Sequence, residues 1–178
     1  AIKTGAVNTA FFNDKRELIG DNFDGKGFVA GLQGEGIDIK NKDIFIAGAG
    51  GAARGIILSL ADSKIKSITL TNRTIKKSYI LQSLIKKYYP NLDIVVSSNP
   101  KKGSILINAT SLGLKKNDPL PFSINGLSEN STVVDIIMKP SITKLLRQSK
   151  NKNINIHIGK HMLDYQVPMI EKFLTKQF

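Results

Sequence analysis

Short apolar segments alternate with longer amphipathic segments along most of the chain. The apolar segments are rich in β-branched residues and have few polar positions, as in Ile44-Phe45-Ile46-Ala47. Such segments are typical of parallel strands that are buried on both faces. The pattern predicts strands at Asp43–Ala47, Ser67–Thr71, Asp93–Val96, Ser104–Asn108, Thr132–Ile136 and Asn155–Ile158.

The segments between these strands have helical periodicity. In the last of them, Leu163, Val167, Ile170 and Leu174 recur at spacings of three and four residues, which places them on one helix face. Strands and helices therefore alternate, which predicts an α/β fold with a doubly wound parallel sheet. The predicted helices are Gly25–Gly34, Gly51–Leu60, Lys76–Tyr88, Ile142–Ser149 and His161–Lys176.

The first twenty residues fit this alternation less well. Ala6–Phe12 and Glu17–Ile19 are two extended stretches separated by the polar residues Asn13 to Arg16, and we interpret them as a hairpin-like edge. They could be the end of another domain.

Composition limits the classes of protein and partner. The 178 residues suit about one domain, and they contain neither a long apolar run nor a secretory signal. The absence of cysteine excludes disulfides and thiol chemistry, which agrees with a cytoplasmic location. A formal charge of +12 favours an anionic partner: nucleic acid, a membrane surface or a phosphorylated small molecule. The lysine pairs lack interleaved aromatics, so we interpret them as solvated faces and expect neither nucleic acid nor membrane as partner.

A glycine-rich turn follows the first predicted parallel strand. Gly48 allows a tight turn, Gly50 lets the backbone approach a pyrophosphate, and Ala53 allows close packing of helix on strand. Free N–H groups at the start of the following helix suit a dinucleotide diphosphate. We therefore predict a dinucleotide site formed by Gly48, Ala49, Gly50, Gly51, Ala52 and Ala53, against the alternative of a plain strand-to-helix turn.

The end of the next strand indicates which dinucleotide is bound. NAD-preferring sites carry an acidic residue about 20 residues after the glycines. This chain has Asn72 and Arg73 there, with Lys77 one helical turn later, and two cations suit a ribose 2′-phosphate. NADP is therefore favoured; in the alternative interpretation Asn72 or Thr74 caps the next helix and Arg73 is solvated.

Three other motifs fail on inspection. The stretch from Gly20 to Gly27 lacks the Ser or Thr of a P-loop, and as a calcium loop it lacks the first and last ligands. His157 and His161 are four residues apart, but Gly159 interrupts the helix that a zinc protease needs. We interpret the two histidines as strand-end and helix-start residues, and we predict no metal.

Seven short motifs occur in an order that resembles the shikimate/quinate dehydrogenase family. They cover essentially the whole chain, which looks like the C-terminal two-thirds of such an enzyme. The motifs are Gly5-Ala6-Val7-Asn8-Thr9, Asn22-x-Asp24-Gly25, Gly48–Arg54, Asn72-Arg73-Thr74, Asn108-Ala109-Thr110-Ser111, Asp135-Ile136-Ile137-Met138-x-Pro140 and Gly159-x-x-Met162-Leu163-x-x-Gln166.

The resemblance implies an NADP-dependent oxidoreductase of aromatic amino acid biosynthesis that reduces 3-dehydroshikimate to shikimate. It implies that residues 1–22 end a substrate-binding domain, that 23–158 form the Rossmann NADP-binding domain, and that the helix in 159–178 closes back toward the substrate cleft. Asp24 matches an acid that binds substrate and pairs with a catalytic lysine. Taken alone, Asp24 is also a natural helix N-cap before Gly25. The other implied contacts are Asn8, Gln166 and Met138 for substrate, and Asn72, Arg73, Thr74, Lys77, Thr110, Ser111, Ile136 and Gly159 for the cofactor.

Two residues depart from the family pattern, and the family's catalytic lysine is absent from these 178 residues. Phe23 stands where the family usually has threonine, and Met138 stands where it usually has a tyrosine near the substrate carboxylate. Quinate or another cyclic polyol acid is therefore an alternative substrate, and a non-catalytic NADP-binding domain is an alternative function. We expect this chain alone to bind NADPH without measurable turnover.

Overall fold

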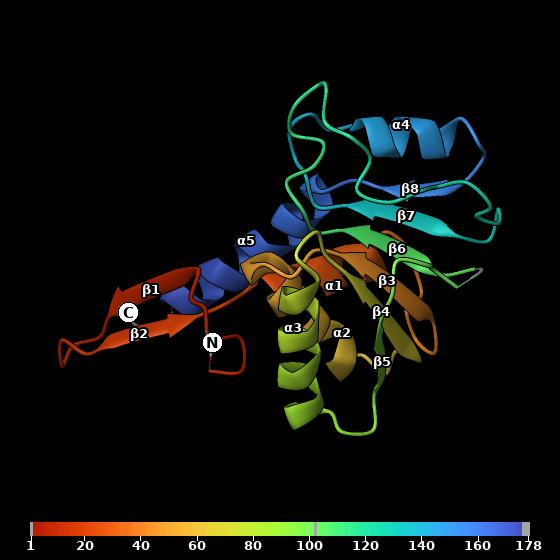
Figure 1. Ribbon diagram of the computed structural model, residues 1–178. Coiled ribbons are helices and arrows are strands. Elements are labelled where there is room, and N and C mark those ends of the chain that lie inside the picture. The colour runs from red at the N-terminus through yellow and green to blue at the C-terminus, as the bar shows by residue number, and fades with distance from the viewer. Residues whose placement is uncertain (1, 102, 176–178) are drawn as a thin grey trace.

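A six-stranded parallel sheet lies at the centre of the computed structural model, which describes residues 2–101 and 103–175 (Figure 1). Its strand order is β5-β4-β3-β6-β7-β8, so the order reverses between β3 and β6. This is the doubly wound arrangement predicted from the sequence. The strands are β3 (Asp43–Ala47), β4 (Ser67–Thr71), β5 (Asp93–Val96), β6 (Ile105–Asn108), β7 (Thr132–Asp135) and β8 (Asn155–His157).

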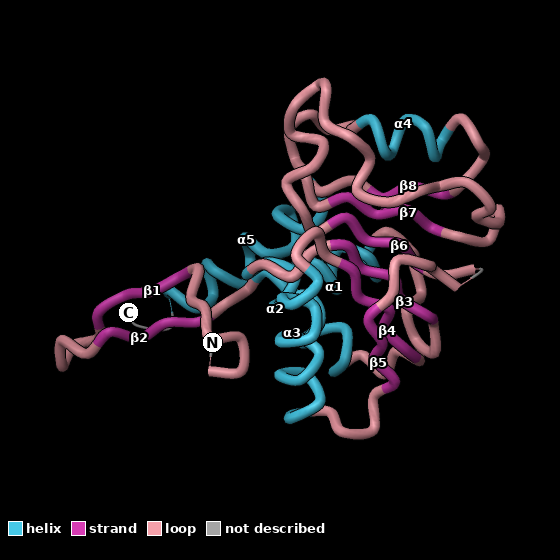
Figure 2. The backbone as a smooth tube through the Cα atoms, viewed as in Figure 1, coloured by secondary structure: helices cyan, strands magenta, loops and turns pink. Residues whose placement is uncertain are grey.

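The alternation of side chains along each strand divides the core into two layers. Ile44 and Ile46 of β3 pack in the layer formed by α1 (Asp24–Gly34), α2 (Gly51–Asp62) and α3 (Ile75–Tyr88). Phe45 points to the other face, where its ring centroid lies 5.3 Å from that of Phe122. That face is covered by α4 (Lys144–Lys150) and by the long loop between β6 and β7 (Figure 2).

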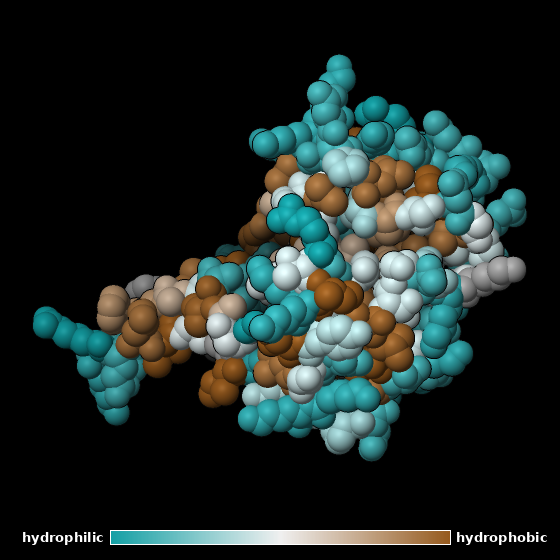
Figure 3. Space-filling model, viewed as in Figure 1, coloured by the Kyte–Doolittle hydropathy of each residue, from teal (hydrophilic) through white to brown (hydrophobic). Residues whose placement is uncertain are grey.

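A two-stranded hairpin projects from this body beside the last helix (Figure 1). Strands β1 (Thr9–Phe12) and β2 (Leu18–Asp21) are antiparallel, as the sequence predicts, and α5 (Lys160–Thr175) extends along them. The ring of Phe173 in α5 lies 5.0 Å from that of Phe11, which fastens the helix to the hairpin. Apolar side chains also gather on the exposed surface of this projection, among them Phe12 and Leu18, which pair in register (Figure 3).

Close packing of α1 on α5 positions the middle of α5. A Cβ atom added at Gly27 would lie 2.7 Å from Gln166 Cβ and 2.8 Å from the Met162 carbonyl oxygen. Only glycine therefore permits this approach of the two helices. The short distance brings Gln166 next to the first turn of α1.

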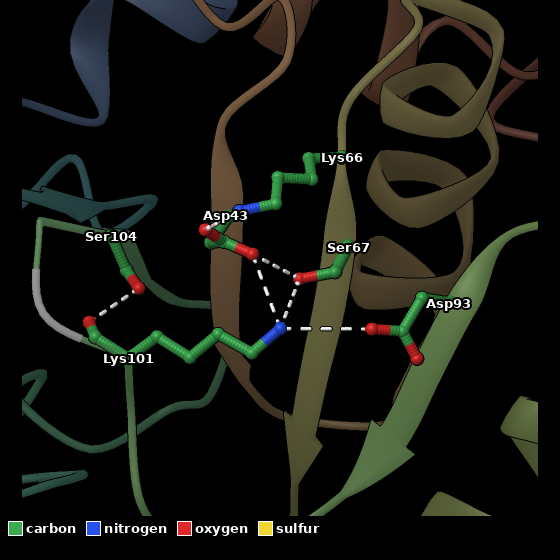
Figure 4. Close-up of polar contacts among 6 residues, drawn as sticks. All are labelled: Asp43, Lys66, Ser67, Asp93, Lys101 and Ser104. Carbon is green, nitrogen blue, oxygen red and sulfur yellow. Dashed lines mark hydrogen bonds and ion pairs between the residues drawn. The ribbon is translucent and has the colours of Figure 1, made fainter.

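Polar side chains stabilise the crossover from β5 to β6, whose described residues form no helix. Asp43, Ser67 and Asp93 occupy matching register positions at the starts of three neighbouring strands. Lys101 in the crossover places its Nζ 3.0 Å from Ser67 Oγ, 3.2 Å from Asp43 Oδ1 and 3.6 Å from Asp93 Oδ2 (Figure 4). The hydrogen bond from Ser67 and the two lysines Lys66 and Lys101 keep the pKa of Asp43 below its usual value, because they stabilise its charged form.

The element boundaries differ from the sequence-based expectation by one to three residues, the largest difference being the start of β1 at Thr9 rather than Ala6. Helix α4 begins at Lys144 rather than Ile142, because the Thr143 hydroxyl caps it by accepting from the Leu146 N–H at 3.3 Å. Helix α1 begins at Asp24, one residue earlier than expected. Ala1, Lys102 and residues 176–178, including the predicted end of the last helix at Lys176, lie outside the described residues. None of the helices in the described part of the chain is long and apolar enough to cross a membrane.

Candidate functional site

The carboxyl ends of the parallel strands bring most of the predicted site residues to one edge of the sheet. The glycine turn follows β3, Asn72 follows β4, Thr110 follows β6 and Ile136 follows β7. In doubly wound sheets, ligands bind at this edge, where the strand order reverses. The order reverses here between β3 and β6, so the glycine turn lies at that point.

The glycine turn leaves the start of α2 open. Gly48 has a φ of +122°, and a Cβ there would lie 2.5 Å from the Ala109 carbonyl oxygen, so both conformation and space require glycine. Gly50 is the N-cap of α2 and has no side chain to cap it, while Cβ atoms added at Gly50 or Gly51 would meet nothing within 4 Å. The first N–H groups of α2 therefore face open space at the positive end of the helix dipole, which suits a phosphate.

The small residues of this turn have two different tasks. Ala53 is fully buried in the core, as expected for close packing of helix on sheet. Ala49 and Ala52 are half-buried, and Gly50 and Gly51 are exposed. Dinucleotide backbone contacts are therefore available from the residues before Ala53.

The segment after β4 concentrates positive charge. Arg73 and Lys77 are exposed, and their side chains have no hydrogen-bond or ion-pair partner within the described residues. The first turn of α3 contains Lys76 and Lys77 and no acidic residue, although cations are unfavourable at the positive end of a helix. A bound anion would relieve this repulsion.

Neither Asn72 nor Thr74 caps α3 with its side chain. Thr74 occupies the N-cap position without a side-chain hydrogen bond, and Asn72 Nδ2 instead donates to the Thr74 carbonyl oxygen at 3.0 Å. The Thr74 hydroxyl and the Asn72 carbonyl oxygen are therefore available to a ligand. Thr74 therefore holds the N-cap position of α3, as the alternative interpretation expects, but neither side chain caps the helix.

A buried polar network, to which sequence reasoning assigned no role, holds the loops after β6 and β7. Asn108 Nδ2 donates to Asp135 Oδ1 at 3.1 Å, and the Thr143 hydroxyl donates to Asp135 Oδ2 at 2.8 Å. Burial raises the pKa of Asp135, while these bonds and one from the Ile137 N–H oppose the rise. The signal in the sequence is a polar residue that ends each of two apolar strands.

Thr110 also takes part in this network. Its hydroxyl donates to Asn108 Oδ1 at 2.7 Å and accepts from the Leu112 N–H at 3.0 Å. The neighbouring Ser111 is exposed and has no hydrogen bond from its side chain among the described residues. Thr110 therefore shapes the loop, whereas the Ser111 hydroxyl is free for a ligand.

The structure brings the two predicted nicotinamide contacts together. A Cβ added at Gly159 would lie 2.5 Å from the Ile136 carbonyl oxygen and 2.6 Å from the Ile137 carbonyl oxygen. Gly159 thus lets the chain after β8 pass directly against the end of β7. Met138 follows at once and is exposed, with 48% of its surface accessible.

Asn8, Asp24 and Gln166 also meet, although they come from three distant parts of the chain. Asn8 Nδ2 donates to Asp24 Oδ1 at 2.7 Å, and Gln166 Nε2 donates to the same oxygen at 3.1 Å. Asn8 Oδ1 accepts from the Phe23 N–H at 3.1 Å, so the amide of Asn8 is oriented on both sides. Asp24 Oδ2 accepts no hydrogen bond within the described residues and can receive one from a ligand.

The structure also decides between two interpretations of Asp24. The residue could have been the N-cap of α1, but Phe23 occupies that position and Asp24 is the first helical residue. Its carboxylate points to Asn8 and Gln166 rather than capping the helix. The N-cap interpretation is therefore wrong.

Phe23 is a packing residue in the structure. It is buried, and its ring centroid lies 5.3 Å from that of Phe173 in α5. Phe23, which stands where the family usually has threonine, therefore takes part in the packing between α1 and α5. Met138, the other residue that differs from the family pattern, is exposed.

The two histidines occupy the expected positions at a strand end and a helix start. His157 Nδ1 and His161 Nδ1 are 3.5 Å apart. Burial, with the neighbouring His161, lowers the pKa of His157 to about 4. No three His, Cys, Asp or Glu residues of the described ranges are grouped so that they could hold a metal ion.

Comparison with known proteins gives one consistent similarity. The family model for shikimate / quinate 5-dehydrogenase matches residues 32–124. The shikimate dehydrogenase (NADP(+)) of Nitrosopumilus maritimus (strain SCM1) is 40% identical over 163 residues, which cover 89% of this chain and 59% of that protein.

Solved structures show the same fold. Shikimate 5-dehydrogenase from Thermus thermophilus, in complex with NADP(H) and shikimate, matches with a TM-score of 0.85 and 28% identity over 98% of this chain and 64% of that one. The ligand-free 5-ketofructose reductase of Gluconobacter sp. strain CHM43 matches with a TM-score of 0.82 and 34% identity over 93% and 61%. The chain spans less than two thirds of the length of each of these relatives.

Proposed function

This chain belongs to the shikimate/quinate dehydrogenase family, and from that premise we propose that the protein is an NADP-dependent shikimate dehydrogenase that interconverts 3-dehydroshikimate and shikimate. The observation that carries the proposal is the convergence of Asn8 and Gln166 on one carboxylate oxygen of Asp24. A domain that only bound NADP would have no use for this arrangement. The shikimate-bound relative supports the substrate class.

The cofactor half of the proposal rests on the two anion sites. The N–H groups at Gly50, Gly51 and Ala52 hold the pyrophosphate, because they face open space at the start of α2. Arg73 and Lys77 hold the 2′-phosphate of NADP, and the lack of an acid there disfavours NAD. Bound NADPH supplies the hydride.

On the substrate side, the chain orients hydroxyl groups and holds charge. Asn8 and Gln166 fix the Asp24 carboxylate, whose free Oδ2 accepts from a substrate hydroxyl or from an ammonium group. We infer that a lysine outside these 178 residues is that ammonium and protonates the developing alkoxide. Ile136 and Gly159 contribute backbone groups beside the nicotinamide, and their close approach shapes that part of the site.

A second candidate is the same type of reaction on quinate or another cyclic polyol acid. Met138 favours it, because an exposed thioether stands where the family usually has a phenolic hydroxyl. A lost hydrogen bond to substrate weakens binding by about 1 kcal/mol, more if the partner is charged. The similarity to a 5-ketofructose reductase agrees with a change of substrate on this fold.

The test is NADPH oxidation by the full-length protein with 3-dehydroshikimate and 3-dehydroquinate in parallel, and NADH as the control cofactor. A higher kcat/KM for 3-dehydroshikimate supports the first candidate, and a higher value for 3-dehydroquinate supports the second. The 178-residue chain should bind NADPH but turn over neither substrate. Binding without turnover by the full-length protein would instead indicate a non-catalytic NADP-binding protein.

A further inference from the structure

Arg54, in the first turn of α2, links the glycine turn to the segment that carries Asn8. Its Nη1 donates to the Thr4 carbonyl oxygen at 2.9 Å, across 50 positions of the chain. Its Nε is buried without a hydrogen-bond partner, and no carboxylate of the described residues pairs with it. A cation here is also unfavourable, since it lies in the first turn of a helix. The hydrogen bond to the Thr4 carbonyl oxygen therefore offsets part of the cost of placing this guanidinium at the positive end of α2.

The chain makes a tight turn at Thr4 to Ala6, next to the Arg54 guanidinium. The Thr4 hydroxyl donates to the Ala6 carbonyl oxygen at 2.8 Å and accepts from the Ala6 N–H at 3.2 Å. Gly5 has a φ of +60°, and a Cβ there would lie 3.2 Å from Arg54 Nη1. Asn8 follows three residues later, so a compact turn connects Arg54 to the amide that orients Asp24.

Part of the space between the start of this segment and α2 is not filled by side chains. A pocket of about 290 Å³ lies between it and α2, lined by Ile2, Thr4, Gly25, Gly55 and Leu58 among others. Polar contacts, including the one from Arg54, therefore help to hold the turn on this side.

We propose that Arg54 is a positioning residue that couples dinucleotide binding at the glycine turn to the geometry of Asn8, Asp24 and Gln166. The inference rests on the proposed function. A pyrophosphate on the first N–H groups of α2 neutralises the positive end of the helix and orders its first turn, which contains Arg54. Arg54 in turn holds the Thr4 carbonyl and hence Asn8 against Asp24. Such coupling is reciprocal, so substrate tightens cofactor binding as much as cofactor tightens substrate binding.

Two variants break the link in different ways. Arg54→Met removes the donor and keeps the unbranched apolar stem of the side chain, while Gly5→Ala keeps the arginine and places a Cβ 3.2 Å from its Nη1 at a position of positive φ. The matched control is Gly36→Ala, because Gly36 also has a positive φ, +78°, but a Cβ there meets nothing within 4 Å. Arg54→Lys retains one donor and should restore part of the function.

The decisive measurement is the dissociation constant of NADP⁺ in the full-length protein, with and without saturating shikimate. In the wild type and in Gly36→Ala, shikimate should tighten NADP⁺ binding, and in Arg54→Met and Gly5→Ala most of that tightening should disappear, with KM for substrate raised about tenfold. Affinity for NADP⁺ alone should change by less than about threefold, because the Arg54 guanidinium donates to the Thr4 carbonyl oxygen and the N–H groups of the glycine turn are unchanged. A change in stability alone would not produce this separation of the two affinities.

Hydrogen exchange in the 178-residue chain gives a readout that needs no activity. NADPH should slow exchange of the Ala6 and Asn8 N–H groups in the wild type and not in Arg54→Met. If both variants fold and keep the full substrate-dependent tightening, the role of Arg54 is wrong. If the wild type itself binds no NADPH and reduces no substrate, the proposed function is wrong instead.

Discussion

Gln166, near the middle of α5, donates from Nε2 to Asp24 Oδ1 at 3.1 Å, although 142 positions separate the two residues. Asn8 donates to the same oxygen, so two amide groups hold one side of the carboxylate and leave Oδ2 to other donors. Amides hold a carboxylate well only while it keeps its charge and its acceptor geometry. The charge of Asp24 is therefore the feature on which this site depends.

Replacing Asp24 by Asn should abolish most of the turnover and leave cofactor binding intact. Asparagine has no negative charge for a substrate or lysine to meet, and its amide can also turn a donor toward Asn8 and Gln166. We therefore expect kcat to fall by about 100-fold or more. The dissociation constant of NADPH, measured by its fluorescence, should change by less than about twofold, because the glycine turn is untouched. The control is Asp14→Asn in the exposed hairpin loop, and a normal kcat in Asp24→Asn would contradict the assignment.

Arg73→Gln should weaken NADPH binding selectively. Removing one of two cations from the 2′-phosphate site should raise the dissociation constant for NADPH about tenfold or more and leave that for NADH almost unchanged. Titration of both cofactors by calorimetry at two salt concentrations checks this. Lys86→Gln, at the other end of α3, is the matched control and should bind both cofactors as the wild type does.

Acid should destabilise the fold through His157. Its pKa is lowered from 6.5 to about 4 by burial and by His161, so the folded state resists protonation that the unfolded state accepts. The stability contributed by neutral His157 is therefore complete above about pH 6.5 and is lost as the pH falls toward 4, by about 2 kcal/mol at pH 5. Glu35, whose Oε2 lies 3.9 Å from His161 Nδ1, is the acidic group near this pair.

Urea unfolding at pH 7.5 and pH 5 tests this assignment. His157→Gln should lose less free energy of unfolding than the wild type between the two pH values. Equal losses in the two proteins would show that other groups cause the acid sensitivity.

Lys101→Met should weaken the sheet without affecting the ligand sites. The Lys101 ammonium joins Asp43, Ser67 and Asp93 at the starts of three strands, at the edge of the sheet opposite the glycine turn (Figure 4). The side chain is 46% exposed, so the loss should be only about 1 kcal/mol and should shrink as salt is added. The control is Lys116→Met, an exposed lysine without a polar contact in the described part of the chain, and a comparable loss there would contradict the role of this cluster.

The sequence predicted the strands of the sheet better than the beginnings of the helices. Asp43–Ala47, Ser67–Thr71 and Asp93–Val96 are confirmed residue for residue, because apolar runs between polar turns define strands locally. The starts of α1 and α4 differ from the expectation. Helix α4 starts after Thr143 because the Thr143 hydroxyl caps it, and α1 starts after Phe23, which occupies the N-cap position without a side-chain hydrogen bond. The network of Asn108, Asp135 and Thr143 was missed because its members come together only when β6 and β7 pair.

By itself the sequence determined the winding of the sheet, the position of the glycine turn and the two cations beyond the next strand, because local periodicity and turn chemistry encode them. Tertiary structure alone decided that Asn8, Asp24 and Gln166 share one carboxylate oxygen and that Arg54 reaches Thr4. Those contacts depend on how closely α5 approaches α1 at Gly27 and on how the first residues cross α2. Distances between segments so far apart in the chain follow from packing, which no short stretch of residues specifies.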